Sequence, residues 1–131
     1  MIQAALMSLC IIGTWQYAGF LYEGHDYPIP NENLVLQFRF QEDGVVNLKY
    51  YRKNEPGICE RTAEYSVKDD VLYQKITWVN PENKPECGQD SDMQNGRESY
   101  TTFQCNGAKM AFKLDLNGKE FDYKMDRVIS P

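Results

Sequence analysis

The amino-acid sequence predicts an all-β domain, an eight-stranded antiparallel up-and-down (meander) barrel with a short N-terminal helix. Two patterns predict it: apolar and polar residues alternate along several segments, and short turn motifs join each segment to the next. The nine tyrosines and six phenylalanines also favour strands over helices. The predicted strands are residues 11–20, 33–40, 45–53, 58–67, 71–79, 97–105, 109–116 and 119–128.

The alternation is clearest in the segment 33–40. One face of this segment carries Leu34, Leu36, Phe38 and Phe40. Gln37 and Arg39 lie on the opposite face, and the segments 109–116 and 119–128 repeat the pattern. A period of two with one polar face is typical of an antiparallel sheet that has one side in water.

The links between strands decide between two architectures. Asn106-Gly107 and Asn117-Gly118 are hairpin motifs, and further turn residues occupy 41–44, 54–57 and 68–70. An unbroken series of hairpins favours a meander, which can close on itself and so remove its edges. A two-sheet sandwich of seven or eight strands is the alternative.

Length and charge limit the possible partners. A chain of 131 residues fits one domain, residues 1–131, in which residues 1–9 form the short helical segment. A net charge of -5 without a long basic run argues against nucleic acid and against an anionic membrane surface. The apolar segment 2–12 is too short for a membrane span. Small molecules and protein partners remain.

The four cysteines indicate the redox compartment in which the protein is located. Cys10, Cys59, Cys87 and Cys105 form no CxxC pair, and the chain has a single histidine, so a zinc site is not expected. An even, scattered set predicts two disulfides and a periplasmic or secreted protein. Four buried free thiols in a cytosolic protein are the alternative. The N-terminus lacks a basic n-region, so we interpret the chain as a mature domain without its export signal, or else as a cytosolic protein with a natural Met1.

No catalytic or metal-binding motif is found. His25 has Asp26 beside it but no motif serine, so a structural role is expected. Asp90 and Asp92 hint at calcium, but Gly96 falls one place late for an EF-hand loop and Thr101 stands where glutamate is needed. The sequence therefore predicts a protein that is not an enzyme, without a metal or a cofactor.

Gly13-Thr14-Trp15, at the start of the first strand, resembles the G-x-W motif of lipocalins and the wider calycin superfamily. The resemblance implies that Trp15 closes the base of the barrel and that a basic residue near the end of the last strand packs across its ring. Arg127 is in that position. The layout is similar to that of small bacterial lipocalin-like domains, although the chain is short for a lipocalin and lacks a clear helix after the eighth strand.

The meander also predicts the disulfide pairing, because alternate links lie at opposite ends of the barrel. Cys59 and Cys87 fall at the end that carries the links 21–32 and 80–96, which we call the mouth. Cys10 and Cys105 fall at the opposite end, the base. The barrel is roughly 20–30 Å long, and a disulfide needs Cα atoms within about 7 Å. The predicted bridges are therefore Cys10–Cys105 and Cys59–Cys87.

Two functions fit this domain. The first is a binding protein for a small apolar or amphipathic molecule at the mouth, through Tyr22, Tyr27, Phe38 and Trp78, above a filled base. The second is a protein-interaction module, such as an inhibitor of an extracytoplasmic hydrolase, that acts through the loops 21–32 and 80–96. A connected pocket of about 300 Å³ or more would favour the first.

Gln74, Thr102 and Gln104 share faces with apolar residues and need polar partners if they point inward.

Overall fold

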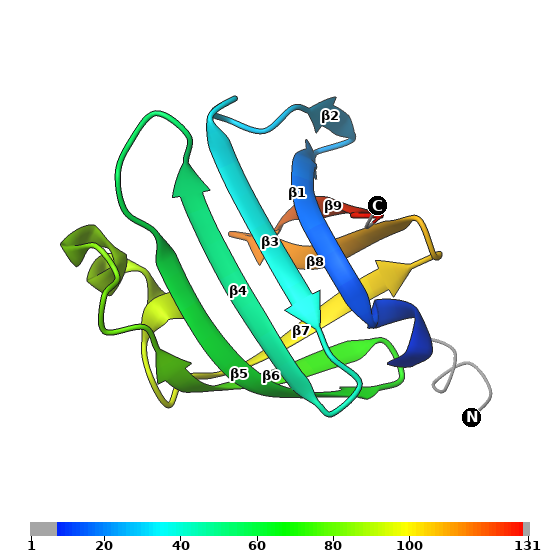
Figure 1. The fold of residues 1–131 in the computed structure, drawn as a ribbon. Coiled ribbons are helices and arrows are strands. Elements are labelled where there is room, and N and C mark those ends of the chain that lie inside the picture. Colours follow the sequence, from blue (N-terminus) through cyan, green and yellow to red (C-terminus); the bar gives the residue numbers. More distant parts are fainter. Residues whose placement is uncertain (1–7, 130–131) are drawn as a thin grey trace.

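The chain forms one antiparallel sheet that curves round and closes on itself (Figure 1). A computed structural model describes residues 8–129. Within these residues the strands are β1 (Gly13–Tyr22), β2 (His25–Tyr27), β3 (Leu34–Phe40), β4 (Val45–Arg52), β5 (Cys59–Lys68), β6 (Val71–Val79), β7 (Glu98–Cys105), β8 (Lys109–Leu116) and β9 (Lys119–Arg127). The pairing of β1 with β9 closes the sheet, so the predicted eight-stranded meander barrel is confirmed and the sandwich is wrong.

The short strand β2 lies inside the segment predicted as the long loop 21–32. It pairs with the end of β1 through a two-residue hairpin. Glu23 and Gly24 both have positive φ, 48° and 83°, as a type I′ turn requires. The sequence gives little sign of this turn, because glutamate rarely adopts the left-handed region.

The base of the barrel is filled by side chains. Alternate residues of the long strands point inward, and in the lower half they leave little free space. The most completely buried apolar residues, each no more than 1% exposed, are Ile11, Trp15, Phe40, Val46, Ala63, Leu72, Phe103 and Met125. Burial of each of the larger aliphatic or phenylalanine side chains in this set stabilises the fold by about 1.5–3 kcal/mol.

Trp15 lies at the centre of this base. Its indole nitrogen donates to the carbonyl of Ile11 at 2.8 Å, at the end of a helical turn formed by residues 8–11. Arg127 covers the ring, with Cζ 4.3 Å from the ring centroid. The guanidinium also donates to the carbonyls of Ile12 and Cys10, at 2.7 and 2.6 Å. Residues 1–7 of the predicted helical segment 1–9 lie outside the described residues.

Both predicted disulfides are present. Cys10 and Cys105 have Cα atoms 6.2 Å apart and join the N-terminal turn to β7 at the base. Cys59 and Cys87 have Cα atoms 5.6 Å apart and join β5 to the long link before β7 at the mouth. The pairing by barrel end, which the meander predicts, is therefore correct.

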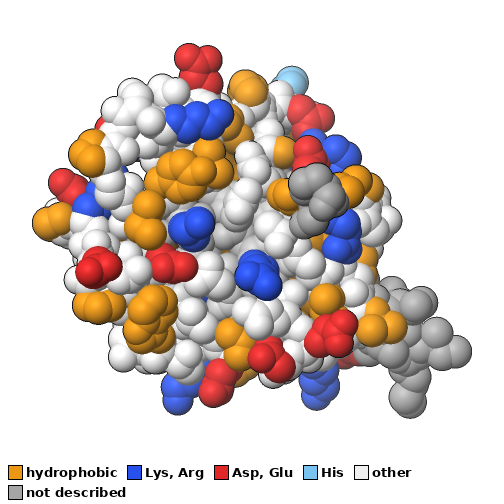
Figure 2. Space-filling model, in the orientation of Figure 1, with side chains coloured by type: hydrophobic (Ala, Val, Ile, Leu, Met, Phe, Trp, Pro, Cys, Tyr) orange, Lys and Arg blue, Asp and Glu red, His pale blue; other side chains and the backbone are white. Residues whose placement is uncertain are grey.

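The outer surface of the barrel carries charged, polar and scattered hydrophobic side chains (Figure 2). On the face formed by β3, β4 and β5, acidic and basic side chains are interspersed rather than gathered into one field (Figure 2). This is the solvated side that the alternation of β3 predicts. Among residues 8–129, no helix has the length and apolarity needed to cross a membrane.

Candidate ligand-binding cavity

The upper half of the barrel encloses a cavity of about 800 Å³ that opens at the mouth. Its apolar wall is formed by inward side chains of β3, β4 and β8, namely Leu34, Leu36, Phe38, Leu48, Phe112 and Leu114. Its polar groups come from β4 to β7, β9 and the long link, among them Tyr50, Arg61, Gln74, Asp90, Asp92, Thr101 and Tyr123. The volume is well above the approximately 300 Å³ that a small-molecule site needs.

The strand pattern explains why the cavity stops where it does. Along β5 the inward residues are Cys59, Arg61 and Ala63; the first two line the cavity, whereas Ala63 belongs to the filled base. Along β3, Phe38 lines the cavity and Phe40 lies in the base. The cavity therefore ends at one level of the barrel, and Arg61 lies at that level.

A two-turn segment closes one side of the mouth. β7 pairs with β6 only as far as Lys75, and the 3-10 turn η2 (Ser91–Met93) contacts both β5 and β6, while the turn η1 (Pro85–Gln89) packs against η2. The Cys59–Cys87 bridge fixes η1, and Met93 of η2 is 4% exposed and joins the core. The link that the sequence marks as a functional loop thus forms part of the cavity wall.

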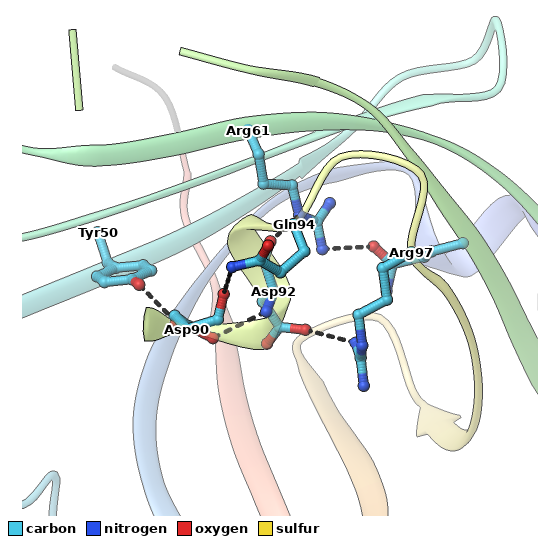
Figure 3. A network of polar contacts seen from close by, with 7 residues as sticks. Tyr50, Arg61, Asp90, Asp92, Gln94 and Arg97 are labelled. Atoms are coloured by element: carbon cyan, nitrogen blue, oxygen red, sulfur yellow. Dashed lines mark hydrogen bonds and ion pairs between the residues drawn. The ribbon is translucent and has the colours of Figure 1, made fainter. Parts of the chain in front are cut away.

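Arg61 is held at the inner end of the cavity by two neutral acceptors (Figure 3). Its Nε donates to the backbone carbonyl of Asp92 at 3.2 Å, and Nη2 donates to Oε1 of Gln74 at 2.9 Å. The side chain packs over Phe38, with Cζ 5.8 Å from the ring centroid. The residue is only 2% exposed, and burial lowers the pKa of its guanidinium to about 10, so it stays charged at neutral pH.

The nearby carboxylates are engaged with other partners (Figure 3). Asp90 accepts the hydroxyl hydrogen of Tyr50 at 2.5 Å and the backbone N–H of Asp92 at 2.8 Å. Asp92 pairs with Arg97 at 3.0 Å. Burial and the hydrogen bond to Asp90 raise the pKa of Tyr50, so this phenol remains a donor at neutral pH. The network therefore fixes η2 over the cavity.

Of the four side chains predicted to bind ligand, Phe38 lies in the cavity wall. It is 6% exposed and meets Phe112 edge-on, with ring centroids 5.4 Å apart. These two rings separate the cavity from the filled base below.

Trp78 points away from the cavity because a β-bulge interrupts β6. On the neighbouring strand, Ala63 pairs with Ile76. The next pair is Thr62 with Trp78, which leaves Thr77 as an extra residue. A shift of one residue moves later side chains to the opposite face, and Trp78 is 44% exposed. The expectation that Trp78 faces the mouth cavity is corrected accordingly.

Tyr22 and Tyr27 pack into an aromatic cluster of β1, β2 and β9 instead of lining the cavity. Tyr27 stacks on Phe20 with ring centroids 5.1 Å apart, and Phe20 stacks on Phe121 at 5.2 Å. Tyr22 meets Phe121 edge-on at 6.4 Å. The β1–β2 hairpin, which the sequence did not predict, brings these rings together.

The most distinctive polar residue of the cavity, Arg61, was not among the predicted site residues. A signal for it was available, because Arg61 lies in register with Cys59 and Ala63 on the inward side of β5. Its partner Gln74 does point inward, as its position among apolar residues allowed, whereas Thr102 and Gln104 are exposed. Within residues 8–129, no three His, Cys, Asp or Glu side chains are grouped to hold a metal ion, and His25 is exposed on β2.

The closed meander and its mouth cavity define a lipocalin-like fold. The protein is similar in structure to a lipocalin-like protein from Bacteroides uniformis, with a TM-score of 0.58 over 90% of this chain and 98% of that chain, at 16% sequence identity. No family model matches the sequence, and a search of curated proteins finds no match. At this identity the likeness concerns the fold.

Proposed function

We propose that the protein is an extracytoplasmic binding protein for a small apolar or amphipathic molecule, which lies in the mouth cavity. The observation that carries this proposal is the cavity itself, about 800 Å³ in volume, with leucine and phenylalanine walls and a few polar groups. The two disulfides support a location outside the cytoplasm. The cavity also favours a small ligand over the alternative of a hydrolase inhibitor, for which a filled barrel would be expected.

Binding can be tested with N-phenyl-1-naphthylamine, an uncharged dye whose fluorescence rises in apolar surroundings. We expect saturable binding by the disulfide-bonded protein. A Leu36→Trp substitution should fill part of the cavity and weaken dye binding about tenfold or more, equivalent to roughly 1.4 kcal/mol. Arg39→Trp, on the exposed face of the same strand, is the matched control and should leave the affinity unchanged.

Two results would contradict the proposal. One is the absence of saturable dye binding by folded protein. The other is equal binding by the wild type and the Leu36→Trp variant, because the dye would then occupy another surface. Native mass spectrometry of freshly purified protein adds an independent measurement, since a co-purifying small molecule should be displaced by the dye.

A further inference from the structure

The buried guanidinium of Arg61 forms no ion pair with any carboxylate among residues 8–129, the part of the chain that the structure describes. Its Nη1 is buried and has no hydrogen-bond partner within the same residues. Such a group is unfavourable, because a buried charge without a direct ion pair, and with one donor group left without an acceptor, recovers only part of the hydration that it loses.

The surroundings of Arg61 also determine what can approach it. From below it is bounded by the filled base, and from the side by Phe38 and Gln74. Asp90 and Asp92 are the acidic groups that act on Arg61 through space, and Arg97 opposes them, but neither aspartate forms an ion pair with Arg61: Asp90 accepts from the neutral Tyr50 and Asp92 pairs with Arg97. The remaining side of this level is the cavity, which Arg61 lines.

From this geometry we propose that the cavity binds a monoanionic amphiphile with its acid group innermost, against Arg61, and its apolar body along Leu36 and Leu34 toward the mouth. This inference rests on the proposed function and specifies its ligand class. The acid group is a carboxylate or a sulfate, each of which can accept two hydrogen bonds from the planar donors of a guanidinium. The apolar body would contact the leucines of β3, while charged side chains of both signs, among them Arg52, Glu55 and Lys84, also line the cavity.

The decisive experiment compares ligands of one chain length on the wild-type protein. Dodecanoate, dodecyl sulfate, dodecanol and dodecyltrimethylammonium are titrated against protein loaded with N-phenyl-1-naphthylamine. We expect the two anions to displace the dye about 10–100-fold more effectively than dodecanol, as a charge-assisted hydrogen bond in a buried site implies. The cation should be the weakest. Inorganic sulfate and acetate serve as head groups alone and should displace dye poorly.

Variants then connect this preference to Arg61. Arg61→Met should reduce the preference for dodecanoate over dodecanol about tenfold or more while dodecanol still binds. Arg61→Lys keeps the charge and should retain part of the preference. Arg39→Met, which removes an exposed cation from the outer face of β3, controls for net charge and should leave the preference intact.

The possible failures are distinguishable. Equal displacement by dodecanoate and dodecanol in the wild type overturns the acid-inward proposal but leaves the binding function standing. A strong anion preference that persists in Arg61→Met overturns the role of Arg61. Absence of dye binding in the wild type overturns the binding function and this inference together. If Arg61→Met does not fold, the ligand series on the wild type and the Arg61→Lys variant still decide.

Discussion

Arg127 lies over the indole ring of Trp15, with its Cζ 4.3 Å from the ring centroid, and so joins the last strand of the barrel to the first. The adjacent Gly13 makes this contact possible. A Cβ atom at position 13 would overlap Nη1 of Arg127, and the φ of Gly13 is 128°. The glycine and tryptophan of the G-x-W sequence thus have separate roles: the tryptophan fills the base and the glycine leaves room for the arginine.

Gly13→Ala should therefore destabilise the protein in two ways, through a strained backbone and through displacement of Arg127. We expect a loss of about 2–4 kcal/mol in the free energy of unfolding. Gly118→Ala is the matched control, because Gly118 also has positive φ, 80°, but a Cβ there would have open space. The control should lose only about 1–2 kcal/mol. Equal losses in urea denaturation would show that the contact with Arg127 is not responsible.

Trp15→Ala should lower the free energy of unfolding by about 3–5 kcal/mol, as large core truncations do. Trp15 is 0% exposed, whereas the second tryptophan, Trp78, is 44% exposed. Trp78→Ala should change stability by less than about 1 kcal/mol. The fluorescence of Trp78→Phe, which reports Trp15 alone, should resist iodide quenching, and that of Trp15→Phe should not. A loss below about 1 kcal/mol for Trp15→Ala would contradict its place at the base.

The elements that could be predicted from the sequence are those determined by local patterns. Alternation placed the long strands, and the hairpin motif Asn117-Gly118 gave a turn whose two residues both have positive φ. The disulfide pairing was predicted by counting the hairpins along the chain. This count assigns each link, and so each cysteine, to one end of the barrel. The resemblance to the G-x-W motif predicted that Arg127 packs over Trp15. In the structure the two residues are paired in the register of β1 and β9.

The site was predicted less completely, because it depends on departures from those patterns. A single extra residue, Thr77, turns Trp78 outward, and no local feature of the sequence marks the bulge. The unexpected hairpin at Glu23 gathers Tyr22 and Tyr27 into an aromatic cluster. Arg61 was not among the predicted site residues, although alternation along β5 places it on the same face as Cys59 and Ala63. The cavity is thus lined by Arg61, a charged residue whose burial without an ion pair is unfavourable.

Ionisation of buried tyrosines should destabilise the protein above about pH 10. Burial raises the pKa of Tyr17, Tyr50, Tyr65 and Tyr123, so these phenols hold their protons longer in the folded state than in the unfolded state. Because the folded state then binds more protons, the contribution of these tyrosines to stability is constant below about pH 10 and falls above it. Urea denaturation at a series of pH values would measure this loss. Absorbance at 295 nm should show these tyrosines ionising late, together with unfolding; their titration near pH 10 in folded protein would contradict the burial described here.

The last prediction concerns the bridge between Cys59 and Cys87, which closes a loop with a sequence separation of 28. Replacing both residues by alanine should lower the free energy of unfolding by about 3–4 kcal/mol through loop entropy. The change should also release η1 from β5, because η1 pairs with no strand and Cys87 is its buried residue. Hydrogen exchange should therefore quicken at residues 85–93 more than in the strands at the base, and the dye affinity should fall because the cavity wall must be ordered on binding. The matched control is alanine at Cys10 and Cys105, which removes a bridge at the base with a sequence separation of 95. It should lower stability somewhat more, by about 4–5 kcal/mol, but leave the exchange pattern of 85–93 and the dye affinity unchanged. If both variants weaken dye binding equally, the mouth bridge has no specific role in holding the cavity.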